Sequence, residues 1–296
     1  MQDEARTTTR NTDDREPLAE LEASVARHPA DAIAWGRLGL SYWRAGALEL
    51  ALTAFAQAVR FGPSIGVFWQ GLGRTRLDLD DVQGALAAAR RAVELEPALP
   101  EIRWLLARVL RRIGKVRLAI VQLEEALRLD AQWPLVFADL GYARLALRDF
   151  AAASEAFETA LQLDPEQLEL WSVFGHCLLQ IDRHGEAVNV LETAVFARPW
   201  DARAWARLGR AYRSTDRADE AARALARGLE LGCDEAWVWL EIGEAAATLG
   251  DREGLEKAHH ALKERDAALA RDLEDRLRGP AETALSHGRA GAVDLP

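Results

Sequence analysis

The sequence has little of what disulfide-stapled domains, metalloproteins and membrane proteins depend on. Its two cysteines in 296 residues, Cys177 and Cys233, lie far apart and match no disulfide or zinc-ligand pattern, so we interpret both as buried apolar residues. Residues 1–16 are polar and charged, and no apolar run follows a basic start. We therefore expect no signal peptide, no membrane anchor and a cytoplasmic location.

Motifs that support catalysis are also missing. The sequence has no Gly-rich phosphate loop and no nucleophile elbow. His176 and Cys177 are neighbours in sequence, but adjacent helical residues face different directions. His259 and His260 have no partners at the spacing of metal ligands. We predict no enzymatic activity, no cofactor and no metal.

The balance of charge limits the class of partner. The formal net charge is −10, which argues against general binding to nucleic acid or to an anionic membrane surface. Binding of RNA or single-stranded nucleic acid by an Arg- and Trp-lined surface therefore remains a minor alternative.

One pattern dominates what is present. Counted from Ala32, residues 32–65 have Trp at position 4, Leu-Gly at 7 and 8, Tyr at 11, Gly at 15, Ala at 20, Phe at 24, Ala at 27 and Pro at 32. The pattern returns every 34 residues as far as residue 235. Spacings of three and four residues place these side chains on one face of each of two helices, and the proline ends the second helix.

This 34-residue pattern resembles the tetratricopeptide repeat family, whose unit is a pair of antiparallel helices. The resemblance implies an all-α fold, a right-handed α-solenoid in which stacked helix pairs share one core. We expect six units over residues 32–235, preceded by a capping helix. The remaining parts are a tail over 1–16, the capping helix over 17–30, a partial seventh unit and capping helix over 236–277, and a tail over 278–296. Regularly spaced leucines predict one long helix over 255–277, continuous or broken once.

The third unit departs from the pattern. It has Arg103 where a Trp is expected, which leaves open whether the neighbouring Trp104 fills that slot or faces outward. We predict that the other Trp residues at position 4 belong to the core: Trp35, Trp69, Trp171, Trp205 and Trp239. Trp133 and Trp200 lie at repeat junctions and are predicted to pack between repeats.

The family resemblance also implies where a ligand binds: the first helices of successive units line a concave groove through positions 2, 5, 9 and 12. These positions contain six Arg and three Glu in a chain of net charge −10. Our candidate binding residues are Trp43, Arg74, Trp104, Arg108, Arg111, Tyr142, His176, Arg203, Arg210 and Arg213.

The groove composition favours a protein scaffold that binds a peptide or protein segment bearing Asp, Glu or a free C-terminus, with apolar anchors near Trp43 and Trp104. The alternative is that these arginines are solvated surface residues. The Lys and Asn that hold chaperone tails in some family members are missing at positions 5 and 9, which are occupied by Gly36 and Leu40 in the first unit. A different functional class, homo-oligomeric self-assembly through 255–277 or a repeat face, stays open.

Overall fold

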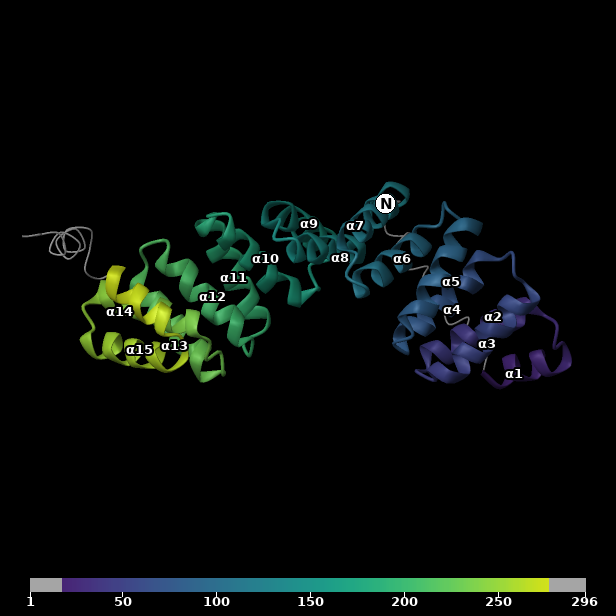
Figure 1. Cartoon of the computed structure of the whole chain (residues 1–296), viewed down its shortest axis with the longest axis horizontal. Helices are drawn as coiled ribbons and strands as arrows, with labels where there is room; N and C mark the ends of the chain where they lie inside the picture. The colour runs from purple at the N-terminus through teal and green to yellow at the C-terminus, as the bar shows by residue number, and fades with distance from the viewer. Residues whose placement is uncertain (1–17, 277–296) are drawn as a thin grey trace, which may run out of the picture. The chain divides into compact units, whose positions relative to one another are not determined.

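The computed structural model describes residues 18–276, so the predicted tails over 1–16 and 278–296 lie outside the described residues. These residues form helices joined by short turns, with no strand among them, and the predicted all-α repeat fold is confirmed (Figure 1). They fall into two compact units, each of which contains more than one of the 34-residue repeats. The first unit ends at Leu147 and the second unit begins at Arg148. No helix within 18–276 is long and apolar enough to cross a lipid bilayer.

The helices follow one another in regular pairs. In the first unit they are α1 (Leu18–Arg27), α2 (Ala32–Arg44), α3 (Leu48–Phe61), α4 (Gly66–Asp78), α5 (Val82–Leu95), α6 (Pro100–Arg112), α7 (Val116–Leu129) and α8 (Pro134–Ala146). In the second they are α9 (Phe150–Leu163), α10 (Leu168–Gln180), α11 (His184–Ala197), α12 (Ala202–Arg213), α13 (Ala218–Glu230), α14 (Ala236–Leu249) and α15 (Arg252–Arg265).

The turn inside each pair repeats with the period of the sequence. Position 15 adopts a left-handed backbone conformation every time, at Gly46, Asp80, Gly114, Arg148, Asp182, Asp216 and Gly250. Glycine adopts this conformation without steric cost, whereas Asp and Arg are strained there because their Cβ atom approaches the backbone. The turn geometry is therefore imposed by helix packing and does not depend on which residue occupies the turn.

Small residues allow the two helices of each pair to approach closely. The alanines at position 20 are completely buried: Ala51, Ala85, Ala119, Ala153, Ala187 and Ala221. At Gly39 an added Cβ atom would lie only 3.0 Å from the ring of Phe55, so a larger residue would require the ring to move.

First helices also contact one another within each unit, namely α2–α4, α4–α6 and α6–α8, then α10–α12 and α12–α14. No pair of successive second helices makes contact of that extent in the described chain. The first helices therefore form the inner row of each unit, and their side chains are the ones available to line a groove.

The Trp residues at position 4 are half-buried rather than fully buried. Their rings pack on the core, and in four of the five Nε1 donates a hydrogen bond to the carbonyl oxygen of the proline six residues earlier. These pairs are Trp35–Pro29 (2.9 Å), Trp69–Pro63 (2.9 Å), Trp171–Pro165 (3.3 Å) and Trp205–Pro199 (2.9 Å). Trp239, which has Cys233 at that place, donates to Asp234 Oδ1 instead. In the third repeat, Arg103 Nε donates to Pro97 O at 3.1 Å, so arginine and not Trp104 occupies the slot.

At the C-terminal end of the described chain, α15 packs against α14 and ends before Asp266, and residues 267–276 form another helical segment. The Asp266 carboxylate accepts the amides of Ala268 and Leu269, which caps this segment. The segment buries Leu273 against α14, where a Cβ atom added to Gly243 would lie 2.6 Å from the leucine. The helix predicted over 255–277 is thus broken once, at Asp266.

Candidate functional site

The predicted groove positions differ in accessibility. Position 2 is the most open, with Ile33 63%, Val67 41% and Leu135 49% exposed. Most position 5 side chains are buried, including Ala138, Ser172 and Ala206, so they support the surface rather than form it. Most position 9 side chains are half-buried. The accessible inner surface consequently follows positions 2, 9 and part of 12.

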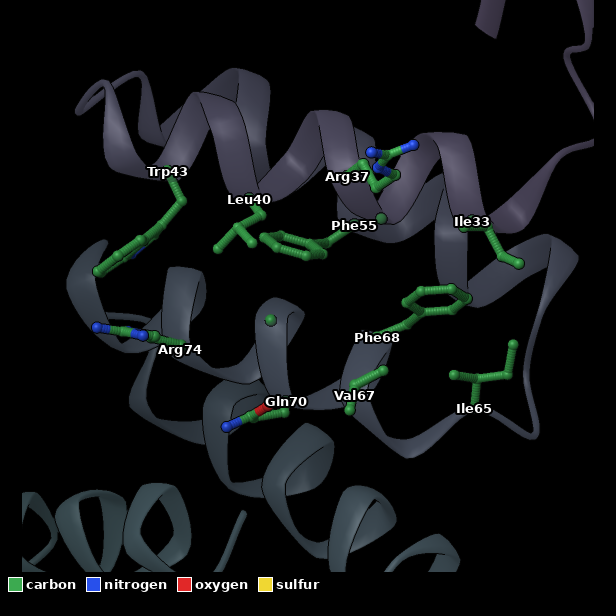
Figure 2. Close-up of a pocket in the computed structure, with 12 residues that line it drawn as sticks. Ile33, Arg37, Leu40, Trp43, Phe55, Ile65, Val67, Phe68, Gln70 and Arg74 are labelled. Carbon is green, nitrogen blue, oxygen red and sulfur yellow. The ribbon is translucent and has the colours of Figure 1, made fainter. Parts of the chain in front are cut away.

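Trp43 and Arg74 form the first feature of this surface. The Arg74 guanidinium carbon lies 3.5 Å from the centre of the Trp43 ring, and Figure 2 shows the two side chains face to face across α2 and α4. Trp43 Nε1 donates to Asp78 Oδ2 at 2.7 Å, which fixes the ring. Burial lowers the pKa of Arg74, and the neighbouring Arg108 charge lowers it further.

An apolar pocket of about 460 Å³ opens beside this pair, between α2 and α4 (Figure 2). Two glycines, Gly36 and Gly71, are among the residues that line it. A Cβ atom added to Gly36 would lie 2.5 Å from the Phe68 ring, and one added to Gly71 would lie 2.2 Å from the Phe55 ring. These two buried phenylalanines use the free space and form part of the pocket wall.

Trp104 and Arg108 form a second tryptophan–arginine pair, here within the single helix α6. The Arg108 guanidinium carbon lies 5.2 Å from the Trp104 ring centre. Trp104 Nε1 donates to Asp139 Oδ2 at 2.6 Å, and its ring packs on Trp133 with 5.2 Å between ring centres. Asp139 also pairs with Arg111 at 3.4 Å, so this part of the predicted Arg column is neutralised.

The remaining predicted residues of the first unit and the start of the second are half-buried. Tyr142 lies on α8 and His176 on α10. The His176 ring meets Phe150 edge-on, with centres 5.9 Å apart. Desolvation, reinforced by Arg207 and Arg210, lowers the pKa of His176 to about 4, so the imidazole is neutral at pH 7.

Three predicted arginines of the second unit are held by carboxylates. Arg203 pairs with Glu235 at 2.7 Å. Arg210 and Arg213 share Glu241, at 3.3 and 2.5 Å, and that carboxylate is 6% exposed. These ion pairs build the surface between α12 and α14 and leave little free positive charge there.

Arg207 was not among the predicted residues, yet it is the least compensated cation of the second unit's inner row. Its Nη1 donates to Ser172 O (3.2 Å) and Ser172 Oγ (2.9 Å), and no carboxylate lies within ion-pair distance of it in the described chain. With His176 and Trp237 it lines a pocket of about 350 Å³. Arg207 stands at position 6, outside the expected register, and only its charge on a first helix could have indicated it.

The two tryptophans predicted to pack at repeat junctions, Trp133 and Trp200, differ in how far they are buried. Trp133 packs on Trp104, as expected of a residue between repeats. Trp200 is 67% exposed and does not pack between repeats, so that prediction was wrong. Phe196, one helical turn earlier, is 88% exposed. At the positions equivalent to Phe196 and Trp200, the other repeats have polar or small residues. Neighbouring repeats therefore offer no large apolar side chain at these positions for Trp200 to pack on.

The two cysteines are buried in the part of the chain that the structure describes. Cys177 and Cys233 are unbridged, and burial raises the pKa of Cys177 to about 11. Within residues 18–276 no group of three or more His, Cys, Asp or Glu side chains could hold a metal ion.

Stacked helix pairs with an inner row of first helices define a helical-repeat protein. Two family models, each described as tetratricopeptide repeat, match residues 17–64 and 71–134, and residues 144–198 and 182–237. Together they cover more than half of the chain. It belongs to the tetratricopeptide repeat family, whose members are in general non-enzymatic scaffolds for protein–protein interaction. No curated protein sequence matches the chain.

Solved structures share the fold. YrrB, described as a TPR protein with an unusual peptide-binding site, is 20% identical with a TM-score of 0.59, covering 62% of this chain and 95% of its own. PilF of Pseudomonas aeruginosa is 18% identical with a TM-score of 0.58, covering 71% and 97%. MamA from Desulfovibrio magneticus RS-1 is 24% identical with a TM-score of 0.51, covering 60% and 96%.

Proposed function

We propose that the chain is a scaffold that binds an acidic segment of a partner protein along the inner row of first helices. One observation carries the proposal: on the inner row of the first unit, Arg74 and Arg108 make no ion pair with a carboxylate among the described residues, whereas Arg111 beside them pairs with Asp139. Arg207, on the inner row of the second unit, likewise makes no ion pair there. A half-buried cation without a counter-ion is costly, and a ligand carboxylate offsets that cost.

The arrangement suits a ligand that binds with little rearrangement. Trp43 and Trp104 are fixed by hydrogen bonds to Asp78 and Asp139, so the arginines that lie on their rings are already oriented. Preorganised donors lose little conformational entropy on binding, and a planar guanidinium can hold a carboxylate through two hydrogen bonds. The proposed ligand therefore bears Asp, Glu or a free C-terminus, as the groove composition indicates.

The test is affinity purification from the source cells with a double variant, Arg74→Met and Arg108→Met. Methionine keeps an unbranched apolar stem and removes the charge. The matched control is Arg90→Met with Arg117→Met, which removes two exposed charges from the second helices α5 and α7. We expect partners to be lost from the first variant alone, and the wild-type interaction to weaken as salt rises. Equal recovery from both variants would refute inner-row binding.

Self-assembly is the second candidate, and the exposed Phe196 and Trp200 favour it. Large exposed aromatic side chains close together in sequence often mark an interaction surface. Sedimentation of the wild type against Phe196→Gln with Trp200→Gln tests it. A concentration-dependent rise in mass that the variant abolishes would support self-assembly, and a monomer at all concentrations would exclude it.

A further inference from the structure

The pocket between α2 and α4 combines an apolar cavity with a cation that has no counter-ion. We infer that this pocket takes one bulky aliphatic or aromatic side chain of a bound protein segment, and that Arg74 receives a carboxylate of the same segment. The inference rests on the proposed function and names the ligand chemistry of its anchor point.

The size and lining of the pocket carry the first half of the inference. Its volume of about 460 Å³ accommodates a complete aromatic or branched aliphatic side chain. Ile33, Leu40 and Val67 at its edge are 63%, 38% and 41% exposed, which is a large apolar surface left in contact with water. Covering it with another apolar group is favourable in proportion to the area removed from water.

The position of Arg74 carries the second half. Its guanidinium lies on the Trp43 ring at the end of the pocket, and its Nε is buried without a hydrogen-bond partner (Figure 2). Asp78, the nearby acidic group, accepts the Trp43 indole and makes no ion pair with Arg74 among the described residues. Asp78 acts on Arg74 only through space, so a carboxylate brought by the ligand supplies the direct ion pair that Arg74 does not make within the described chain.

The two halves lie close enough for one short segment. Trp43, Leu40 and Arg74 all line the same pocket, so the apolar side chain and the acidic group are expected within one or two residues of each other. The surface around Arg111 differs, because Asp139 already supplies a negative charge there and the cavity of about 350 Å³ beside Arg111 is lined mainly by charged side chains.

The experiment compares three capped peptides on the full chain by calorimetry and by NMR of labelled methyl groups. The probes are acetyl-Asp-Phe-Asp-Asp-amide, the same peptide with Ala for Phe, and acetyl-Asn-Phe-Asn-Asn-amide. We expect the first to bind about tenfold to a hundredfold more tightly than the alanine peptide, with its largest shifts at Ile33, Leu40 and Val67. Replacing its acidic residues should cost about tenfold.

Two variants locate the effect. Leu40→Gln should reduce the preference for Phe over Ala, whereas Leu118→Gln, an equally conservative change at a 53% exposed leucine of α7, should not. Arg74→Met should remove the preference for Asp over Asn. Circular dichroism confirms that each variant is folded. Equal affinities for the Phe and Ala peptides, or methyl shifts that appear on concentrating the protein without peptide, would overturn the inference.

The outcome is separable from that of the proposed function. If Arg74→Met with Arg108→Met loses its partners but the Phe and Ala peptides bind alike, the scaffold function stands and the apolar anchor is refuted. If the variant loses no partner while the Phe peptide binds in the pocket, inner-row recruitment is refuted and the pocket chemistry stands.

Discussion

Arg103 donates through Nε to the carbonyl oxygen of Pro97 at 3.1 Å, in the place where other repeats use the indole of a tryptophan. Trp205 and Pro199 make the equivalent hydrogen bond at 2.9 Å. Both side chains carry a planar N–H group at a similar distance from the backbone. Position 4 therefore requires a hydrogen-bond donor to the proline carbonyl as much as it requires an apolar side chain. A second hydrogen bond, from Arg103 Nη1 to Gln122 Oε1, holds the arginine in place.

Two neighbouring tryptophans should differ in how much stability is lost on truncation. Trp205→Ala is expected to destabilise the protein by about 2–3 kcal/mol, below the usual cost for a fully buried Trp because its ring is half-buried. Trp200→Ala, at a side chain that is 67% exposed, should change stability by less than about 0.5 kcal/mol. Urea unfolding of both variants measures the difference. Equal losses would mean that Trp200 packs in solution.

Left-handed turns offer a stabilising substitution. Asp216 has a φ of 59°, where a residue with a Cβ atom is strained, so Asp216→Gly should stabilise by about 0.5–1 kcal/mol. The reverse change at an equivalent turn, Gly114→Ala, should destabilise by about 1 kcal/mol, because its φ is 78° although a Cβ there would touch nothing within 4 Å. Thermal unfolding checks both, and a destabilised Asp216→Gly would show that the aspartate makes a compensating contact.

The buried carboxylate of Glu241 should matter more for stability than an exposed one. Glu241→Gln removes the carboxylate that pairs with Arg210, while Arg213 keeps its ion pair with Glu244 at 2.9 Å, at an expected cost of about 2–3 kcal/mol. Glu169→Gln at an exposed position of α10 is the control, with an expected change below about 0.5 kcal/mol. Denaturant midpoints at low and high salt measure both. A loss that disappears at high salt would place Glu241 in solvent.

His176 predicts a pH dependence with a definite sign. Its pKa falls from the usual 6.5 to about 4 in the folded chain, chiefly through desolvation. As the pH is lowered, the unfolded chain therefore binds the proton at a higher pH than the folded chain does. The stability contributed by the neutral imidazole is complete above about pH 6.5 and is lost as pH falls toward 4. NMR titration should find His176 neutral at pH 5.5, and Arg210→Met should raise its pKa. A His176 pKa near 6.5 in the wild type would contradict the burial.

The repeat sequence determined the fold and most of its internal order. Alanine at position 20 and glycine or alanine at position 8 recur every 34 residues because two helices must approach closely there, and such packing rules are local enough to read from one chain. The same reasoning placed Trp43, Arg74, Trp104 and Arg108 on the first helices, where the structure has them.

Tertiary structure decided how those residues pair. Whether an arginine is free or neutralised depends on carboxylates from other helices: Asp139 for Arg111, Glu235 for Arg203 and Glu241 for Arg213. The pocket beside Arg74 likewise depends on two phenylalanine rings that fill the space left by Gly36 and Gly71. Helical periodicity fixes the face on which a residue lies, but its neighbours across that face come from distant segments and are set only when the helices stack.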